Sequence, residues 1–126
     1  VREHGLTQAT QVRVATVNRV LELTEQPDGR VTVDMGAPDF SPAALPFDAA
    51  GLAPRTEGSD EVWPLALDGR TLELRLVSMG NPHAVIEVDD VDAAALATLG
   101  PALQRHAAFP DSVNVGFAQV VARDRV

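Results

Sequence analysis

The sequence predicts an α+β fold of two similar lobes, built from mostly antiparallel strands. Two alternating apolar regions are each interrupted by Asp-Gly, a strong signal for a hairpin between antiparallel strands. Both hairpins then end in Met-Gly-x-Pro, once at Met35 and again at Met79. Leucines at helical spacing follow the second copy and add a helix. A repeat of two copies is too short for a solenoid and favours a duplicated, pseudo-symmetric fold.

Each hairpin is predicted from two alternating runs and the turn between them. The expected strands lie in residues 11–24 and 31–35 for the first hairpin, and in residues 62–67 and 71–77 for the second. The first run is interrupted near Asn18-Arg19. A two-residue hairpin turn needs positive φ, which glycine supplies, so the turns should contain Gly29 and Gly69.

The segment between the hairpins is expected to connect the two lobes. Residues 38–47 contain three prolines, which resist both a helix and a central strand. We therefore place the lobe boundary near residue 45, with part of the N-terminal lobe in residues 1–45 and part of the C-terminal lobe in residues 46–126. Residues 49–60 are rich in glycine, proline and acidic side chains, which predicts a loop.

Two further strands are expected after the second hairpin. Residues 85–88 form one, and the apolar residues 113–121 predict a last strand that is buried. Between them, the aspartates at 89, 90 and 92 offer N-cap oxygens and negative charge to a helix N-terminus. We interpret these carboxylates as a helix cap and not as a metal site.

The expected helix is defined by Leu96, Leu99 and Leu103, which share one helical face. Pro101 interrupts this pattern. Proline is tolerated in the first turn of a helix, so the regular helix should begin near Thr98. The alternative is two short turns in sequence.

Composition excludes several classes of function. The chain has 126 residues, no cysteine and a formal net charge of -8 at pH 7. The lack of cysteine excludes disulfides and thiolate chemistry within this chain, and the acidic balance disfavours nucleic acid as a partner. No apolar run is long enough for a membrane span and no signal peptide is visible, so the cytoplasm is the expected location. The start at Val1 and the strand-like run at the other end predict an interior piece of a longer protein.

No metal or cofactor site is predicted. The sequence has no calcium-loop spacing, no glycine-rich phosphate loop, no His-Glu-x-x-His and no Gly-x-Ser-x-Gly. His4 and His106 are interpreted as surface residues.

Asn81 and His83 stand out when the two Met-Gly-x-Pro copies are compared. The first copy continues as Ala37-Pro38-Asp39, where the second reads Asn81-Pro82-His83. The turn itself needs only glycine and proline, so the amide and the imidazole are candidates for function. Asn81 either bonds its own backbone in an Asx turn or grips a polar ligand through both a donor and an acceptor. His83 is either an ordinary half-buried or surface histidine, or a proton-holding group of a site.

Asn114 is a second unusual amide, because it lies between two valines in an apolar run that disfavours asparagine. It either marks a strand end or bulge, or it is a second ligand-binding amide beside Asn81. A buried amide without a partner would cost on the order of 1–3 kcal/mol, so burial would demand a hydrogen bond.

The order and spacing of these motifs resemble the diaminopimelate epimerase family over nearly the whole chain. The most specific pair is Gly80-Asn81-Pro82-His83 followed by Asn114-Val115-Gly116-Phe117. The supporting segments are residues 2–6, 31–36, 77–79, 88–91 and 99–101.

The resemblance implies a fold of two lobes, each a barrel-like sheet around a helix, with the site in the cleft between them. It implies cofactor-independent epimerisation of LL-diaminopimelate to meso-diaminopimelate, in lysine and peptidoglycan-precursor synthesis. Two cysteines act as acid and base on opposite faces of the carbon. Family members are commonly homodimers. The binding partner that the resemblance implies is the small-molecule substrate, diaminopimelate.

By the order of the family's motifs, both catalytic cysteines lie outside these residues, so the chain alone is expected to be inactive. The resemblance implies that His83 tunes the proton affinity of the cysteines, and that Asn81 and Asn114 bind the distal amino acid end of the substrate. The sequence departs from many relatives at Ala84, where Cys is frequent, and at Val113, where Thr is common. Neither position is expected to be catalytic.

Two other functions stay open at the level of sequence. One is a related isomerase of the same fold that acts on another small acid. The other is a non-catalytic binding domain that is complete as given.

Overall fold

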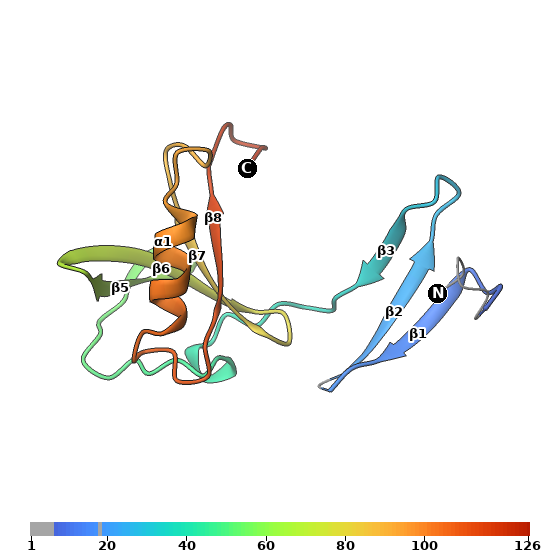
Figure 1. Ribbon diagram of the computed structural model, residues 1–126, viewed down its shortest axis with the longest axis horizontal. Coiled ribbons are helices and arrows are strands. Elements are labelled where there is room, and N and C mark those ends of the chain that lie inside the picture. The colour runs from blue at the N-terminus through green and yellow to red at the C-terminus, as the bar shows by residue number, and fades with distance from the viewer. Residues whose placement is uncertain (1–6, 18) are drawn as a thin grey trace. The chain divides into compact units, whose positions relative to one another are not determined.

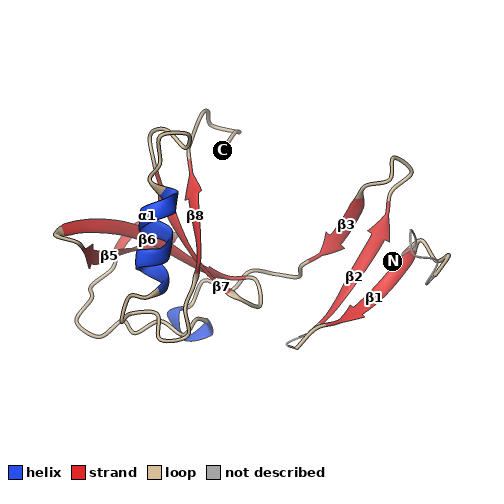
Figure 2. Ribbon diagram, in the orientation of Figure 1, coloured by secondary structure: helices blue, strands red, loops and turns tan. Residues whose placement is uncertain are grey.

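The computed structural model describes residues 7–17 and 19–126. The chain divides into two compact units, Val1–Ala37 and Pro38–Val126. Figures 1 and 2 show strands in both units and a helix in the second, which confirms the predicted α+β class. The division falls before the boundary expected near residue 45, because Leu45 packs in the core of the second unit. The assignment of residues 1–45 and 46–126 to two lobes stays a prediction.

The first unit contains a three-stranded antiparallel sheet in the order β1-β2-β3. Its strands are β1 (Gln11–Ala15), β2 (Val20–Glu25) and β3 (Val31–Asp34). Gly29 has a φ of +83° in the turn between β2 and β3, so the first hairpin is confirmed. None of the residues described in this unit is buried. His4 and the motif at residues 2–6 lie outside the described residues.

The second unit contains a five-stranded sheet in the order β4-β5-β6-β7-β8. The strands are β4 (Arg55–Glu57), β5 (Asp60–Leu67), β6 (Arg70–Ser78), β7 (Pro82–Glu87) and β8 (Asn114–Ala118). Neighbours from β4 to β7 are antiparallel, whereas β8 is parallel to β7. Asp68 and Gly69 both have positive φ, +50° and +76°, as a type I′ turn requires, so the second hairpin is confirmed.

β4 corrects the prediction of a loop over residues 49–60. Arg55–Glu57 pairs with the start of β5, which extends beyond the predicted strand to Asp60. The composition of the segment is typical of a loop. It forms a strand only because the backbone of β5 offers it hydrogen-bonding partners.

The connecting segment contains no central strand, as its prolines predicted. It forms a short 3₁₀ turn, η1 (Pro42–Ala44). Asp39 and Ser78 exchange two backbone hydrogen bonds, of 2.9 and 2.7 Å. The chain after the first Met-Gly-x-Pro copy is therefore tied to the strand before the second copy. The Ser41 hydroxyl donates to the Asp39 carboxylate at 2.7 Å, and this bond lowers the pKa of Asp39.

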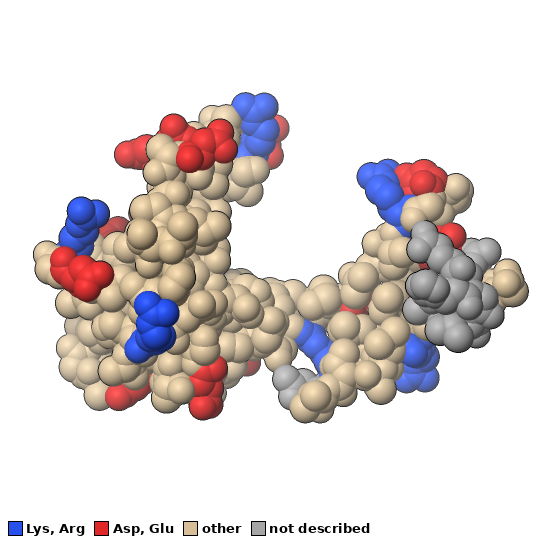
Figure 3. All heavy atoms as spheres, viewed as in Figure 1, with Lys and Arg blue, Asp and Glu red and all other residues tan. Residues whose placement is uncertain are grey.

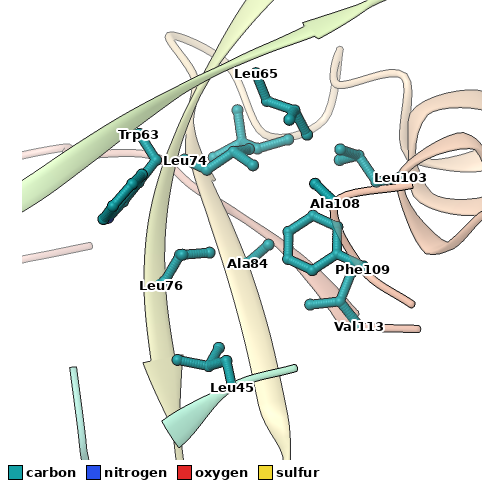
Figure 4. Close-up of a cluster of buried hydrophobic side chains, with 11 residues drawn as sticks. Leu45, Trp63, Leu65, Leu74, Leu76, Ala84, Leu103, Ala108, Phe109 and Val113 are labelled. Atoms are coloured by element: carbon teal, nitrogen blue, oxygen red, sulfur yellow. The ribbon is translucent and has the colours of Figure 1, made fainter. Parts of the chain in front are cut away.

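One face of the five-stranded sheet carries the hydrophobic core (Figure 4). Its buried members are Leu45, Trp63, Leu65, Leu74, Leu76, Ala84, Ile86, Leu103, Ala108, Phe109 and Val113. Phe47 packs on Trp63 and Phe109, with ring centroids 5.3 and 5.1 Å apart. Ala84 and Val113 are both core residues, which accounts for their apolar character.

The helix α1 (Leu96–Gln104) is continuous and contains Pro101, so neither a start near Thr98 nor a pair of short turns is correct. Proline lacks the N–H that would bond to the carbonyl of Ala97. The packing of Leu103, which is fully buried in the core, compensates for this loss. Among the described residues, no helix has the length and apolar character that crossing a membrane would need.

The aspartates after β7 do not cap this helix. The N-cap position is Ala95, which makes no side-chain cap bond. Asp90 instead accepts the backbone N–H groups of Asp92 and Ala93, at 2.9 and 3.3 Å, in a turn before the helix. Local hydrogen bonding has therefore competed with capping for the same carboxylate.

The last strand is shorter and less buried than predicted. β8 ends at Ala118, because only this part of the apolar run pairs with β7. Val113 is 3% exposed, whereas Val120 and Val121 are 56% and 49% exposed. An isolated bridge joins Ala122 to Arg125, so the strand-like run at residues 120–126 contains a turn.

A chain of ion pairs crosses strands β4, β6 and β7. Its members, which we call the charge ladder, are Arg55, Glu57, Glu73, Arg75 and Glu87, and each arginine bridges two glutamates at 2.7–3.1 Å. The hydrogen bond with Arg55 lowers the pKa of Glu73, and the same bond raises the pKa of Arg55. Elsewhere, on the face shown in Figure 3, charged side chains of the second unit are scattered among uncharged ones.

Candidate functional site

The loop Met79-Gly80-Asn81 connects β6 to β7 between the paired residues Ser78 and Pro82. Gly80 has a φ of +92°, a left-handed conformation that disfavours a side chain. Gly36 in the first copy has a φ of +69°, so glycine has the same role in both copies. Pro82 is already the first residue of β7, so the motif spans the end of a loop and the start of a strand.

Asn81 contributes its main chain to the loop. Its carbonyl oxygen accepts hydrogen bonds from the N–H of Met79 at 3.2 Å and from Nδ1 of His83 at 3.0 Å. The hydrogen bonds described for Asn81 thus use this main-chain oxygen and not the side chain of an Asx turn. The residue is exposed.

His83 is the second residue of β7 and is half-buried. Successive residues of a strand face opposite sides of a sheet. Because Ala84 and Ile86 belong to the core, His83 and Val85 lie on the other face. The same argument places Val77, the register partner of His83 on β6, on that face.

Asn114 is the first residue of β8 and pairs in register with His83 on the neighbouring parallel strand. Paired residues of adjacent strands point to the same side, so both side chains lie on the face opposite the core. Asn114 is exposed, so the hydrogen bond that a buried amide would demand is not required here. Asn114 marks the end of a strand, as one of the two alternatives proposed, and its exposure leaves it accessible to a ligand.

The structure therefore brings all three predicted residues together, although Asn114 is far from the others in sequence. β7 places His83 between the β6–β7 loop, which carries Asn81, and the start of β8, which carries Asn114. Each of the two side-chain amides can both donate and accept hydrogen bonds.

A cavity of about 680 Å³ lies beside this site. Val77 and Val85, which share the face of His83, line it together with Phe40, Trp63 and Arg75. Phe40 is 63% exposed and lies shortly after Pro38, the last residue of the first Met-Gly-x-Pro copy. Phe40 was not predicted as a site residue from the sequence, because only the backbone pairing of Asp39 with Ser78 brings it to β6.

His106 has a structural role that the sequence did not predict. It is half-buried, with Nε2 3.1 Å from the carbonyl oxygen of Ala66 and Nδ1 3.1 Å from the N–H of Ala108. It joins the segment after α1 to β5 and is not a surface residue. Within the described residues, no group of three or more His, Cys, Asp or Glu side chains could hold a metal ion.

Comparison with known proteins bears directly on this site. The family model described as diaminopimelate epimerase matches residues 75–126. The chain is also 54% identical over all 126 residues to a diaminopimelate epimerase of Burkholderia pseudomallei strain 668, and 52% identical to that of Burkholderia thailandensis. The resemblance to the diaminopimelate epimerase family is confirmed. Asn81, His83 and Asn114 all fall within the residues that match its model.

The chain spans 44% of the length of these diaminopimelate epimerases. Its two sheets and single α-helix, among the described residues, agree with the mixed fold that the family resemblance implied.

Proposed function

We propose that this chain is part of a diaminopimelate epimerase, which interconverts LL-diaminopimelate and meso-diaminopimelate. The observation that carries the proposal is the sequence identity of 52–54% over all 126 residues to proteins of that name. The clustering of Asn81, His83 and Asn114 at one end of β7 and β8 supports it, because these residues carry the family motifs.

The chemistry requires groups on two sides of one carbon. The α-proton of an amino acid is weakly acidic, so one base must remove it and one acid must reprotonate the opposite face. Two cysteines supply these groups in the proposed mechanism, without pyridoxal phosphate or another cofactor. The chain has no cysteine, so the 126 residues alone are expected to be inactive.

The residues of this chain would bind the substrate and set the protonation of the site. The amides of Asn81 and Asn114 would hold the distal ammonium and carboxylate, which do not react. His83 would lie near the cysteines and tune their proton affinity through charge and hydrogen bonding. We propose further that the protein acts in the cytoplasm as a homodimer, and that neither nucleic acid nor a membrane is its partner.

The experiment that tests this proposal uses the full-length protein that carries the chain. Purified protein is incubated in D₂O with LL-diaminopimelate, and both meso product and deuterium at the α-carbon are measured. The expected result is conversion that carries deuterium into the product without added cofactor. Conversion of a different acid with none of LL-diaminopimelate would favour a related isomerase, and binding without exchange would favour a non-catalytic domain.

A further inference from the structure

The two Met-Gly-x-Pro copies hold their glycines through the same kind of contact. In the first copy, the N–H of Gly36 donates to the Asp34 carboxylate at 2.8 Å. In the second, the N–H of Gly80 donates to the hydroxyl oxygen of Ser78 at 3.3 Å. Asp34 and Ser78 are the last residues of β3 and β6. Because glycine has more conformational freedom than other residues, such a bond restricts the direction in which the loop leaves its strand.

Ser78 is itself held by the connecting segment. Its N–H and C=O bond to Asp39 at 2.7 and 2.9 Å, as in a hydrogen-bonded antiparallel pair. The pairing of β5 with β6 stops at Leu74, so β5 offers no partner to Ser78. Its register partner on β7 is Pro82, which has no N–H to donate. Asp39 therefore supplies the main-chain bonds that fix the end of β6.

The side chain of Asp39 fixes its own part of the connecting segment. One carboxylate oxygen accepts the N–H of Ser41 at 2.9 Å and the hydroxyl of the same residue at 2.7 Å. The carbonyl of Ser41 in turn accepts the N–H of Ala44 at 2.9 Å, at the end of η1. Hydrogen bonds to an ionised carboxylate are stronger than those between neutral groups. The backbone of Asp39 is therefore held in place before it meets β6.

We infer that Ser78 is a positioning residue for Asn81, and that Asp39 holds Ser78 in place. The loop that carries Asn81 begins directly after Ser78, and the N–H of Met79 closes it on the Asn81 carbonyl at 3.2 Å. The Ser78 hydroxyl fixes Gly80 between these two points. Ser78 acts through the loop and needs no contact with the substrate. The inference rests on the proposed function only for the identity of the substrate that Asn81 binds.

A double-mutant cycle in the full-length protein tests whether Ser78 acts through Asn81. Ser78→Ala should lower kcat/KM for diaminopimelate by about 3- to 10-fold, as expected for the loss of one neutral hydrogen bond. Ser78→Thr keeps the hydroxyl and should restore the wild-type value. The double variant Ser78→Ala/Asn81→Ala should be no slower than Asn81→Ala, because no amide is left to position. Effects that multiply would mean an independent role of Ser78 and would overturn the inference.

Water exchange of backbone amides, measured by NMR without substrate, tests the same contact directly. The amide of Gly80 should exchange about 3- to 10-fold faster in Ser78→Ala, because it loses its acceptor. Ser78→Thr should show the wild-type rate, and the amide of Gly69 in the other hairpin of this sheet should not change in either variant. An unchanged rate at Gly80 in Ser78→Ala would overturn the inference.

A matched pair of aspartate variants tests the part assigned to Asp39. Asp48 makes a similar turn in the same unit, where its carboxylate accepts the N–H of Ala50 at 2.9 Å, but its main chain bonds to Ala108 and not to β6. Asp39→Ala should speed exchange at Gly80, whereas Asp48→Ala should not. Equal effects, or none from either, would contradict the role of Asp39. The expected exchange pattern in a protein that does not convert diaminopimelate would retain Ser78 as the residue that holds the loop and reject the proposed function.

Discussion

The main-chain oxygen of Asn81 and its side-chain amide can be tested separately. Its main-chain oxygen binds Nδ1 of His83, while its side-chain amide lies at an exposed position. Alanine retains the main-chain oxygen and removes only the amide, so a substitution can separate the two groups. The Asn81→Ala variant therefore tests the side-chain amide without removing the main-chain hydrogen bond to His83.

We predict that Asn81→Ala in the full-length protein lowers kcat/KM for diaminopimelate by about 10- to 100-fold, as expected for the loss of a hydrogen bond to a charged group. The melting temperature should change little, because the residue is exposed and its backbone bonds remain. Steady-state kinetics and a thermal melt measure both. Gln104→Ala, an exposed amide at the end of α1, is the control. A lower melting temperature with unchanged turnover would make Asn81 only a turn residue.

The two histidines allow a second comparison at this scale. We predict that His83→Ala changes the pH profile of kcat/KM, because it removes the imidazole that we propose tunes the proton affinity of the cysteines. His106→Ala should leave the profile unchanged and lower the free energy of unfolding by about 1–3 kcal/mol, since the N–H of Ala108 loses its acceptor. Rates over a pH series and denaturant unfolding measure the two effects. Identical profiles for wild type and His83→Ala would remove His83 from the reaction.

At the scale of elements, the charge ladder connects the short strand β4 to the sheet. Arg55 of β4 pairs with Glu73 of β6 at 2.7 Å, and this bond lowers the pKa of Glu73. A lowered pKa means that the native state favours the ionised carboxylate. The stabilisation is complete above the ordinary value of 4.5 and is lost as the pH falls through the lowered value.

We predict that hydrogen exchange of β4 amides, relative to that of β6, accelerates as the pH falls below about 4.5. Glu73→Gln should remove this dependence and make β4 exchange faster at neutral pH. Added salt should act in the same direction, since exposed ion pairs are screened. Asp111→Asn, in an exposed loop, is the control. Exchange of β4 that is insensitive to both pH and the variant would contradict a role of the ladder.

The elements differ in how far local sequence determined them. Both hairpins were predicted because Asp-Gly turns depend on the backbone of two residues. β4 and the end of β8 were not, because a strand exists only where a neighbour offers hydrogen bonds. The start of α1 was also missed, since the packing of Leu103 outweighs the local effect of Pro101.

At the scale of the molecule, the two units differ in how far a buried core can stabilise them. All the buried core residues lie in the second unit, and none of those described in the first is buried. A small sheet is stable by itself only if it has a hydrophobic face that it can bury, for example against a helix. The first unit is therefore expected to depend on further contacts.

We predict that a chain of residues 38–126 retains a cooperative unfolding transition, whereas residues 1–37 alone are unfolded. Circular dichroism and proton NMR dispersion measure both. Leu103→Ala in the longer chain should cost about 2–5 kcal/mol, because the side chain is fully buried. A folded peptide of residues 1–37, or a non-cooperative chain of residues 38–126, would contradict this division of stability.

The sequence alone determined the two hairpins with their turn glycines, Gly29 and Gly69, and the candidate residues Asn81, His83 and Asn114. These depend on local backbone chemistry and on motifs that single residues carry. Only the tertiary structure decided that β8 runs parallel to β7 and places Asn114 beside His83. It also decided that the Asn81 carbonyl holds Nδ1 of His83. Such contacts depend on strand register and loop direction, which the packing of the whole sheet sets.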